Sequence, residues 1–292
     1  MIDLHLHTNK SDGSDEPLDL LKKLVEKNYK VFSITDHVDL EANIEILNEL
    51  KSQKYPIRFI TGCEISSVFD GRNLHLLCYG FDPYSEKMIN MIEKVASLRK
   101  QRITAIFDHL RNKHNILLPE EDRAYILSLK IPSKVHITDA AMKLGIKMKR
   151  KEFFDKCLDD MESREFKIVA EKVIETVTSS SGVVSFAHPI EVQKEYQIDI
   201  AELQNMTKRL KDKGLSAVEV YHSAHNESDV FAYSQIASEL GLLVSGGSDY
   251  HGKNKDVEIG QLTKYGYVPD EEKITILSLI HSNKETSMLN NN

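Results

Sequence analysis

The chain has 292 residues, of which 41% are hydrophobic and 28% are charged, as in a soluble globular protein made of one large domain or one domain with an insertion. A formal net charge of −7 argues against a broad basic surface, so we expect no binding of duplex DNA. No apolar run is long enough to span a bilayer, and a predicted strand that begins almost at Met1 leaves no room for a signal peptide.

Short apolar runs alternate with amphipathic helical segments along most of the chain. Seven of these runs are predicted strands: Ile2–His7, Val31–Thr35, Ile57–Thr61, Leu74–Tyr79, Val183–Ala187, Ala217–Tyr221 and Leu242–Ser245. Because strands that alternate with helices form parallel sheets, seven such units predict an α/β fold with a closed barrel.

The helices between these strands are predicted from start signals and apolar stripes. Ser14 and Asp15 are expected to cap the first helix, with Pro17 in its first turn. Buried stripes are expected at four places: Leu18, Leu21, Leu24 and Val25; Ile44, Leu47 and Leu50; Ile200, Leu203, Met206 and Leu210; and Val230, Ile236, Ala237 and Leu240.

The alternation stops from about Val95 to Glu165. This stretch is rich in Lys and Arg, has a mostly helical pattern and contains no convincing buried strand. We therefore expect three parts: a first barrel part over residues 1–95, a helical insertion over 96–165 and a second barrel part over 166–292.

Histidines and carboxylates gather at the ends of the predicted strands. His5 and His7 lie two positions apart in a strand, so their side chains point the same way and can reach one ion. The other residues of this kind are Asp12, Asp36, His37, Glu64, His75, His188, Asp249 and His251. Because parallel barrels build their active sites where the strands end, most of these side chains are expected to meet at one rim.

Each of these residues has an ordinary explanation when it is considered alone. A single His in a strand is usually hydrogen-bonded, and an Asp before a helix is usually a cap. Several imidazoles and carboxylates buried together without a cation, however, would be strongly destabilising. A hydrolytic metal cluster is therefore the hypothesis that accounts for the whole set.

Six segments together resemble the motifs of the PHP (polymerase and histidinol phosphatase) family, and they extend over nearly the whole chain. They are His5-Leu6-His7-Thr8, Ser11-Asp12-Gly13, Thr35-Asp36-His37, Gly62-Cys63-Glu64-Ile65-Ser66, Ala187-His188-Pro189 and Gly247-Ser248-Asp249-Tyr250-His251-Gly252. The resemblance implies a metal-dependent phosphoesterase. It also implies a distorted, TIM-like (β/α)7 barrel, the PHP fold, with three divalent metal ions at its C-terminal rim.

The resemblance further implies which side chains hold which metal. The first metal would be bound by His5, His7, Glu64 and Asp249, the second by Glu64, His75 and His188, and the third by Asp12, His37 and His251. Mixed imidazole and carboxylate ligands suit Mn, Zn or Fe. Glu64 would bridge two metals, and a hydroxide held between those metals would attack phosphorus in line.

Three further residues are candidates for catalysis or substrate binding. Asp36 is expected either to orient His37 or protonate the leaving group, or else to cap its strand end. Because family members often carry a His in this region, the resemblance suggests that His225 touches the substrate phosphate, with His222 beside it. A polar residue at the entry to a helix is the alternative explanation.

The predicted insertion resembles that of the nucleoside 3′,5′-bisphosphate phosphatases, which also act as 5′–3′ exoribonucleases on short RNA. Their Gly-Arg-Pro-His-Ile-Ala segment corresponds here to Ser133-Lys134-Val135-His136-Ile137-Thr138, so His136 is kept and Lys134 replaces an Arg. A Lys lacks the two-pronged contact that Arg makes with phosphate. Arg99 and Arg102 share a helix face, either as phosphate ligands or as a solvated basic face.

These observations predict a phosphoesterase that acts on a small phosphomonoester, a nucleoside 3′,5′-bisphosphate or a short 5′-phosphorylated RNA. Histidinol phosphate or another sugar-type phosphate is the alternative substrate, and a non-catalytic nucleotide-binding module is the alternative of another class. An amidohydrolase is disfavoured by the Asp249-x-His251 pair and by Glu64 in place of a strand-end Lys. A cytoplasmic location is expected because Cys63, Cys78 and Cys157 form no CxxC pair.

Overall fold

The computed structural model describes residues 1–159, 161, 163–266 and 269–280. The chain divides into two compact units. One, here called the barrel unit, consists of Met1–Met91 and Val169–Asn292, and the other, the helical unit, consists of Ile92–Ile168. Among the described residues, no helix is long and apolar enough to cross a membrane.

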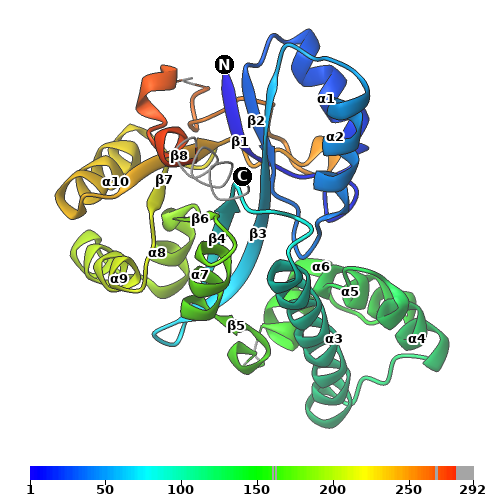
Figure 1. The fold of residues 1–292 in the computed structure, drawn as a ribbon. Helices are drawn as coiled ribbons and strands as arrows, with labels where there is room; N and C mark the ends of the chain where they lie inside the picture. Colours follow the sequence, from blue (N-terminus) through cyan, green and yellow to red (C-terminus); the bar gives the residue numbers. More distant parts are fainter. Residues whose placement is uncertain (160, 162, 267–268, 281–292) are drawn as a thin grey trace. The chain divides into compact units, whose positions relative to one another are not determined.

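A barrel-shaped sheet forms the centre of the barrel unit (Figure 1). Its hydrogen-bonded order is β1-β2-β3-β4-β6-β7-β8. The strands are β1 (Ile2–Leu6), β2 (Val31–Ile34), β3 (Arg58–Phe69), β4 (Arg72–Tyr79), β6 (Val183–Phe186), β7 (Ala217–His222) and β8 (Leu243–Gly247), and a short strand β5 (Ile168–Val169) precedes β6 in the chain. The predicted α/β barrel is confirmed.

The two ends of this sheet meet through the backbone that follows β8. Asp249 N donates to His5 O at 2.8 Å, and His7 N donates to Tyr250 O at 2.9 Å. The first and last strands are therefore joined without a full strand ladder, and the sheet is nearly closed.

The direction of β4 differs from the expected all-parallel arrangement. β4 pairs antiparallel with both β3 and β6, whereas the other neighbouring strands of the order run parallel. Asp70 and Gly71 join β3 to β4 with positive φ angles of 50° and 71°. Asp-Gly between two apolar runs favours a two-residue hairpin turn. The sequence therefore indicated that β3 and β4 run antiparallel, and the prediction of a parallel strand here was wrong.

Helices cover the sheet of the barrel unit. They are α1 (Pro17–Glu26), α2 (Glu41–Ser52), α7 (Ala170–Thr178), α8 (Pro189–Tyr196), α9 (Ile200–Asp212) and α10 (Glu227–Leu240), with the 3₁₀ turns η3 (Gly252–Asn254) and η4 (Glu271–Lys273). α1 packs on α2, α7 on β3 and β6, and α10 on β7 and β8 (Figure 1). Their apolar faces and the sheet form the core of this unit.

The start of α1 corrects the expected cap. The N-cap position is Glu16, which makes no side-chain capping bond. Ser14 Oγ instead accepts from Lys253 N at 2.8 Å, and Asp15 Oδ2 accepts from Tyr250 Oη at 2.8 Å. These side chains therefore hold the segment after β8, which carries Asp249 and His251, rather than the helix.

The buried face of α2 is also rotated from the expected stripe. Its buried residues are Ala42, Asn43 and Ile46, whereas the expected stripe residues Ile44, Leu47 and Leu50 are only half-buried. Asn43 turns inward because its side-chain amide satisfies both Gly62 N and Gly62 O, each at 2.8 Å.

Two other expected stripes are partly wrong. In α9 the buried residues are Leu203, Met206, Thr207 and Leu210, and Ile200 is exposed. In α10 the buried residues are Tyr233, Ile236 and Ala237, while Val230 and Leu240 are half-buried. First and last turns of a helix can face solvent even where the apolar period continues.

The helical unit is built from one long helix and several short ones around its own apolar core. Its elements are most of α3 (Glu86–His114), then α4 (Glu120–Ser128), α5 (Lys134–Lys143), α6 (Arg150–Phe153), the π-helical turn η1 (Phe154–Leu158) and the 3₁₀ turn η2 (Arg164–Phe166). Its core includes Ile106, Leu110, Ile137 and Phe153.

Candidate metal centre

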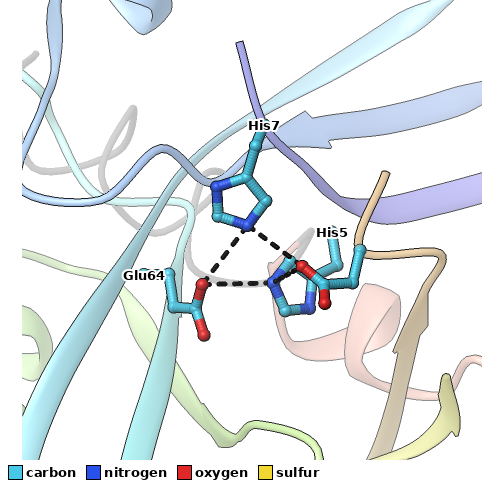
Figure 2. Close-up of side chains that lie close together, drawn as sticks. His5, His7 and Glu64 are labelled. Carbon is cyan, nitrogen blue, oxygen red and sulfur yellow. Dashed lines mark hydrogen bonds and ion pairs between the residues drawn. The ribbon is translucent and has the colours of Figure 1, made fainter. Parts of the chain in front are cut away.

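Four side chains from three strands face one another at one rim of the barrel. His5 lies in β1, His7 follows it, Glu64 lies in β3 and Asp249 follows β8. His5 Nε2 and His7 Nε2 each lie 3.3 Å from Glu64 Oε2 (Figure 2), and they lie 3.4 and 3.3 Å from Asp249 Oδ1. The alternation of side chains along β1 places both imidazoles on the same face, as expected.

Glu64 lies at the centre of a larger cluster of imidazoles. Besides His5 and His7, its Oε2 atom lies 3.4 Å from His37 Nε2. Its other oxygen, Oε1, lies 2.7 Å from His75 Nδ1 and 2.9 Å from His188 Nε2. One carboxylate therefore faces five histidines, three on one oxygen and two on the other.

The reversed direction of β4 explains how His75 reaches this rim. His75 lies near the start of β4, and because β4 runs antiparallel to β3 its start lies level with the end of β3. Ser66 lies opposite His75 in the register, and Ser66 Oγ is 2.9 Å from His75 Nε2. This contact leaves His75 Nδ1 directed at Glu64.

A third group lies around Asp12. Asp12 Oδ1 is 3.3 Å from His251 Nε2 and 3.5 Å from His7 Nδ1, and Asp12 Oδ2 is 3.7 Å from His37 Nε2. The Asp12 side chain is 50% exposed, whereas Glu64 is buried. This group is therefore the most open of the three.

The burial of these charges shifts their proton affinities strongly. Burial alone would raise the pKa of the Glu64 carboxyl, but the surrounding imidazoles outweigh it and hold the pKa well below the usual range. Burial would likewise lower the pKa of His7, but the neighbouring carboxylates of Asp249 and Glu64 raise it to about 9. For His37, burial prevails and lowers the pKa to about 3.

The donor set fits divalent metal ions. In four groups of residues, donor atoms lie within 4.8 Å of one another: His5, His7, Glu64 and Asp249; Glu64, His75 and His188; His7, Asp12 and His251; and His5, Glu219 and His222. His7 Nε2 is buried and has no hydrogen-bond partner among the described residues, which suits a nitrogen that coordinates a metal. His37, which was predicted for the third set, lies nearby, with its Nε2 atom 3.7 Å from Asp12 Oδ2, and His7 stands in its place in the group around Asp12.

Residues 3–188 match the model of the PHP domain. The protein belongs to the PHP domain family. The predicted family is thus confirmed, and it covers more than half of the chain.

Curated relatives of this PHP protein are bacterial phosphoesterases. The chain is 26% identical over 263 residues to a 5′-3′ exoribonuclease of Haemophilus influenzae, covering 89% of this chain and 93% of the relative. It is 20% identical over 254 residues to a 3′,5′-nucleoside bisphosphate phosphatase of Chromobacterium violaceum, covering 86% and 87%. Family and names together indicate a metal-dependent phosphoester hydrolase, the predicted enzyme class.

Solved structures agree on the fold. A protein described as a metal-dependent phosphoesterase from Bifidobacterium adolescentis matches with a TM-score of 0.73 and 22% identity, covering 96% of this chain and 95% of the other. An amidohydrolase from Chromobacterium violaceum matches with a TM-score of 0.75 and 20% identity, covering 97% and 96%. The PHP fold of this chain is therefore confirmed. Both matches cover nearly the whole chain, so they extend over the helical unit as well.

The other predicted residues of the barrel unit lie around the PHP centre. Asp36 is buried and accepts from Thr8 N at 2.7 Å and from the Thr8 and Ser11 hydroxyls. It therefore fixes the loop between His7 and Asp12.

His222 is the last residue of β7 and His225 lies on the turn that follows it, and both are buried. His222 Nδ1 accepts from Ala224 N at 3.0 Å, while its Nε2 lies 3.3 Å from Asp249 Oδ2. His225 Nδ1 donates to Val220 O at 2.9 Å, and its Nε2 has no hydrogen-bond partner among the described residues. His222 thus touches a predicted ligand directly, and His225 does not.

The predicted substrate ligands Arg99, Arg102, Lys134 and His136 lie in the helical unit. Lys134 Nζ forms an ion pair with Asp159 Oδ1 at 2.6 Å and lies over the Phe154 ring. Burial lowers the pKa of Arg102, and the negative charge of Asp159 partly opposes this shift. His136 Nδ1 closes a capping box with Ser133 at the start of α5, so one of its nitrogens has a structural role.

Three residues around the centre were not predicted from the sequence. Glu219 in β7 is fully buried and reaches both His5 and His188, Glu191 lies 3.1 Å from His188 Nδ1, and Lys255 pairs with Asp249 Oδ2. Glu219 had a recognisable signal, because a carboxylate within the apolar run Ala217–Tyr221 needs a buried partner.

Proposed function

We propose that this PHP protein hydrolyses a phosphomonoester of a small nucleotide, either a nucleoside 3′,5′-bisphosphate or the 5′ end of a short RNA. The observation that carries the proposal is the cluster around Glu64, where five imidazoles face one buried carboxylate. The names of the relatives, an exoribonuclease and a nucleoside bisphosphate phosphatase, support the nucleotide class.

Three divalent ions, Mn, Zn or Fe, are proposed at this rim. His5, His7, Glu64 and Asp249 would hold the first, Glu64, His75 and His188 the second, and Asp12, His37 and His251 the third. Such ions would polarise the phosphoryl oxygens and lower the pKa of a water molecule toward neutrality. The carboxylates of Asp12, Glu64 and Asp249 would offset only half of their charge, so the rim would attract an anionic phosphate.

Further residues of the chain have proposed roles around the phosphate. Asp36 would hold the loop that carries Asp12 and would orient the neighbouring His37, because its carboxylate already bonds Thr8 and Ser11. His222 would orient Asp249 through its Nε2 atom. His225 is proposed beside the substrate because its buried Nε2 is left for a further contact.

A second phosphate is proposed to distinguish the nucleotide from simpler substrates. Its proposed ligands are Arg99, Arg102, Lys134 and His136. The support for them is that two of these cations, Arg102 and Lys134, lie near the same carboxylate, Asp159, and so belong to one charged region. A cytoplasmic location is proposed with this substrate class.

A screen with added Mn²⁺ that measures both released inorganic phosphate and released mononucleotides tests the substrate class. A nucleoside 3′,5′-bisphosphate and a short 5′-phosphorylated RNA should be hydrolysed with a higher kcat/KM than histidinol phosphate or p-nitrophenyl phosphate. A preference for histidinol phosphate would move the assignment to sugar-type phosphates. Nucleotide binding without release of phosphate or of mononucleotides, in protein shown to be loaded with metal, would instead indicate a non-catalytic binding module.

A further inference from the structure

Glu219 joins two separate parts of the candidate metal centre. Its Oε1 atom lies 2.9 Å from His5 Nδ1, and its Oε2 atom accepts from the backbone N–H of His188 at 2.7 Å. His5 belongs to β1 and His188 follows β6, so one side chain of β7 holds residues that are far apart in the chain. Both carboxylate oxygens are therefore already engaged.

The first of these bonds determines how His5 presents its ring. Nδ1 of His5 donates to Glu219, which leaves Nε2 directed at Glu64 and Asp249, 3.3 and 3.4 Å away. A carboxylate bonded to the outer nitrogen of a ligating histidine fixes the ring orientation and makes the inner nitrogen a better donor. The carboxylate of Glu219 is completely buried, so solvent does not compete for this bond.

The second bond holds an unusual backbone. His188 has φ 25° and ψ 67°, a conformation that residues other than glycine rarely adopt. This backbone directs His188 Nε2 at Glu64 Oε1. Because its N–H donates to a charged acceptor, the bond to Glu219 Oε2 is of the stronger, charge-assisted kind and compensates the strained conformation.

We propose that Glu219 is a positioning residue that sets the affinity of two metal sites at once, by orienting His5 in the first and His188 in the second. This inference rests on the metal centre of the proposed function and adds a residue that acts on it without contacting the phosphate. The site needs two acceptors, one for each N–H donor. Glutamate supplies both, whereas glutamine supplies one acceptor and one donor group.

Titration of the metal-free protein with Mn²⁺ alone tests this role without any substrate. Glu219→Gln keeps the size of the side chain but places an amide NH₂ against His5 Nδ1–H or His188 N–H. We expect Mn²⁺ affinity to fall by about 10- to 100-fold, with both the His5 site and the His188 site affected. The visible spectrum of bound Co²⁺ should also change, because it reports the ligand set.

Glu191→Gln is the matched control. Glu191 contacts the side chain of His188 at 3.1 Å, and its own side chain is 56% exposed. Its loss should weaken only the His188 site and should leave the Co²⁺ spectrum of the His5 site unchanged. A wrong substrate class would leave all these metal titrations unaffected, so the two proposals fail separately.

An Mn²⁺ isotherm of folded Glu219→Gln that superimposes on that of the wild type would overturn the proposal. If Glu219→Gln does not fold, Glu219→Asp decides, because it keeps the charge and both acceptors but is shorter by one methylene. Weakened Mn²⁺ binding by folded Glu219→Asp would support the proposal, because the shorter side chain could no longer reach both His5 Nδ1 and His188 N. Wild-type binding by that variant contradicts it.

Discussion

Ionisable side chains are buried together at the rim of the barrel unit, whereas in the helical unit they mostly pair at the surface. Glu64 is buried and faces five histidines, while Lys151 and Asp155 form an ion pair with side chains that are 86% and 51% exposed. The helical unit uses His136 to cap a helix. The surroundings of a histidine or carboxylate, rather than its presence, therefore distinguish a candidate site.

The largest effect is expected at Glu64. Glu64→Gln keeps the size of the side chain but removes the charge that five imidazoles share. Because this carboxylate is the proposed shared ligand of two metals, kcat/KM should fall by at least about 100-fold at fixed Mn²⁺, equivalent to about 2.7 kcal/mol of activation free energy. Steady-state kinetics on the best nucleotide substrate measures this.

His251→Ala is the comparison variant within the rim. It removes contacts with Asp12 and Asp249 but keeps the Glu64 carboxylate, so its loss of activity should be clearly smaller than that of Glu64→Gln. Near wild-type turnover by Glu64→Gln would show that the centre does not depend on a shared carboxylate.

Metal loading should stabilise the protein. Three Mn²⁺ ions per chain are expected by elemental analysis, and each site should add about 2.7 kcal/mol at a free concentration of 100 times its Kd. Thermal unfolding with Mn²⁺ and after chelation gives the difference. One bound ion per chain, with every proposed ligand intact, would contradict a centre of three metals.

A change in the helical unit should alter substrate choice more than catalysis. Lys134→Ala should raise KM for a nucleoside 3′,5′-bisphosphate about tenfold, equivalent to about 1.4 kcal/mol, and leave p-nitrophenyl phosphate unchanged. His136→Ala should act in the same direction. Lys143→Ala, which removes an exposed cation paired with Asp122, is the control and should change neither substrate. Equal losses on both substrates would assign Lys134 a structural role.

The buried His225 should make the metal-free protein sensitive to mild acid. Burial, aided by His222, lowers its pKa to about 3, against about 6.5 in an unfolded chain. As the pH falls below 6.5, the unfolded chain binds a proton that the folded chain does not, so the folded state loses up to about 1.4 kcal/mol per pH unit down to about pH 3. Urea unfolding between pH 7 and 5 should show a shallower loss in His225→Gln. An unchanged slope would assign the acid sensitivity to other groups.

The smallest effect is expected for the exposed pair in the helical unit. Lys151→Ala removes an ion pair that solvent screens on both sides, so the urea midpoint should stay within experimental error. A clear fall in the urea midpoint would show that exposed ion pairs contribute to the stability of the helical unit, contrary to the contrast drawn with the buried charges of the barrel unit.

The barrel and the family followed from the sequence because both depend on residue types at strand ends. Side chains two residues apart in a strand point to the same face, so the proximity of His5 and His7 was predictable without knowing the neighbours of β1. The roles of these residues remain predictions, but their side chains do lie together. The direction of β4 was missed because strand periodicity is the same in both directions, although Asp70-Gly71 indicated the turn.

Side chains with long-range partners were the hardest to predict. Glu219 looked like part of an apolar strand, and its partners His5 and His188 lie 214 and 31 residues away. The inward rotation of α2 depends on one amide, Asn43, that happens to meet the backbone of Gly62. Local patterns carry no information about such pairs, because only the folded chain brings them together.

Closure of the barrel has a consequence for the order of folding events. The β3–β4 hairpin joins neighbouring residues, whereas Ser248 N bonds Asp3 Oδ1 across 245 residues. Contacts that close long loops generally form late, because their entropic cost is met only when much of the chain is ordered. We therefore expect the cluster of His5, His7 and Asp249 to form after the Glu64–His75 hairpin. A metal ion present before the sheet closes would find only some of its ligands in place. Tight metal binding would therefore be the last step in forming the folded, metal-loaded protein.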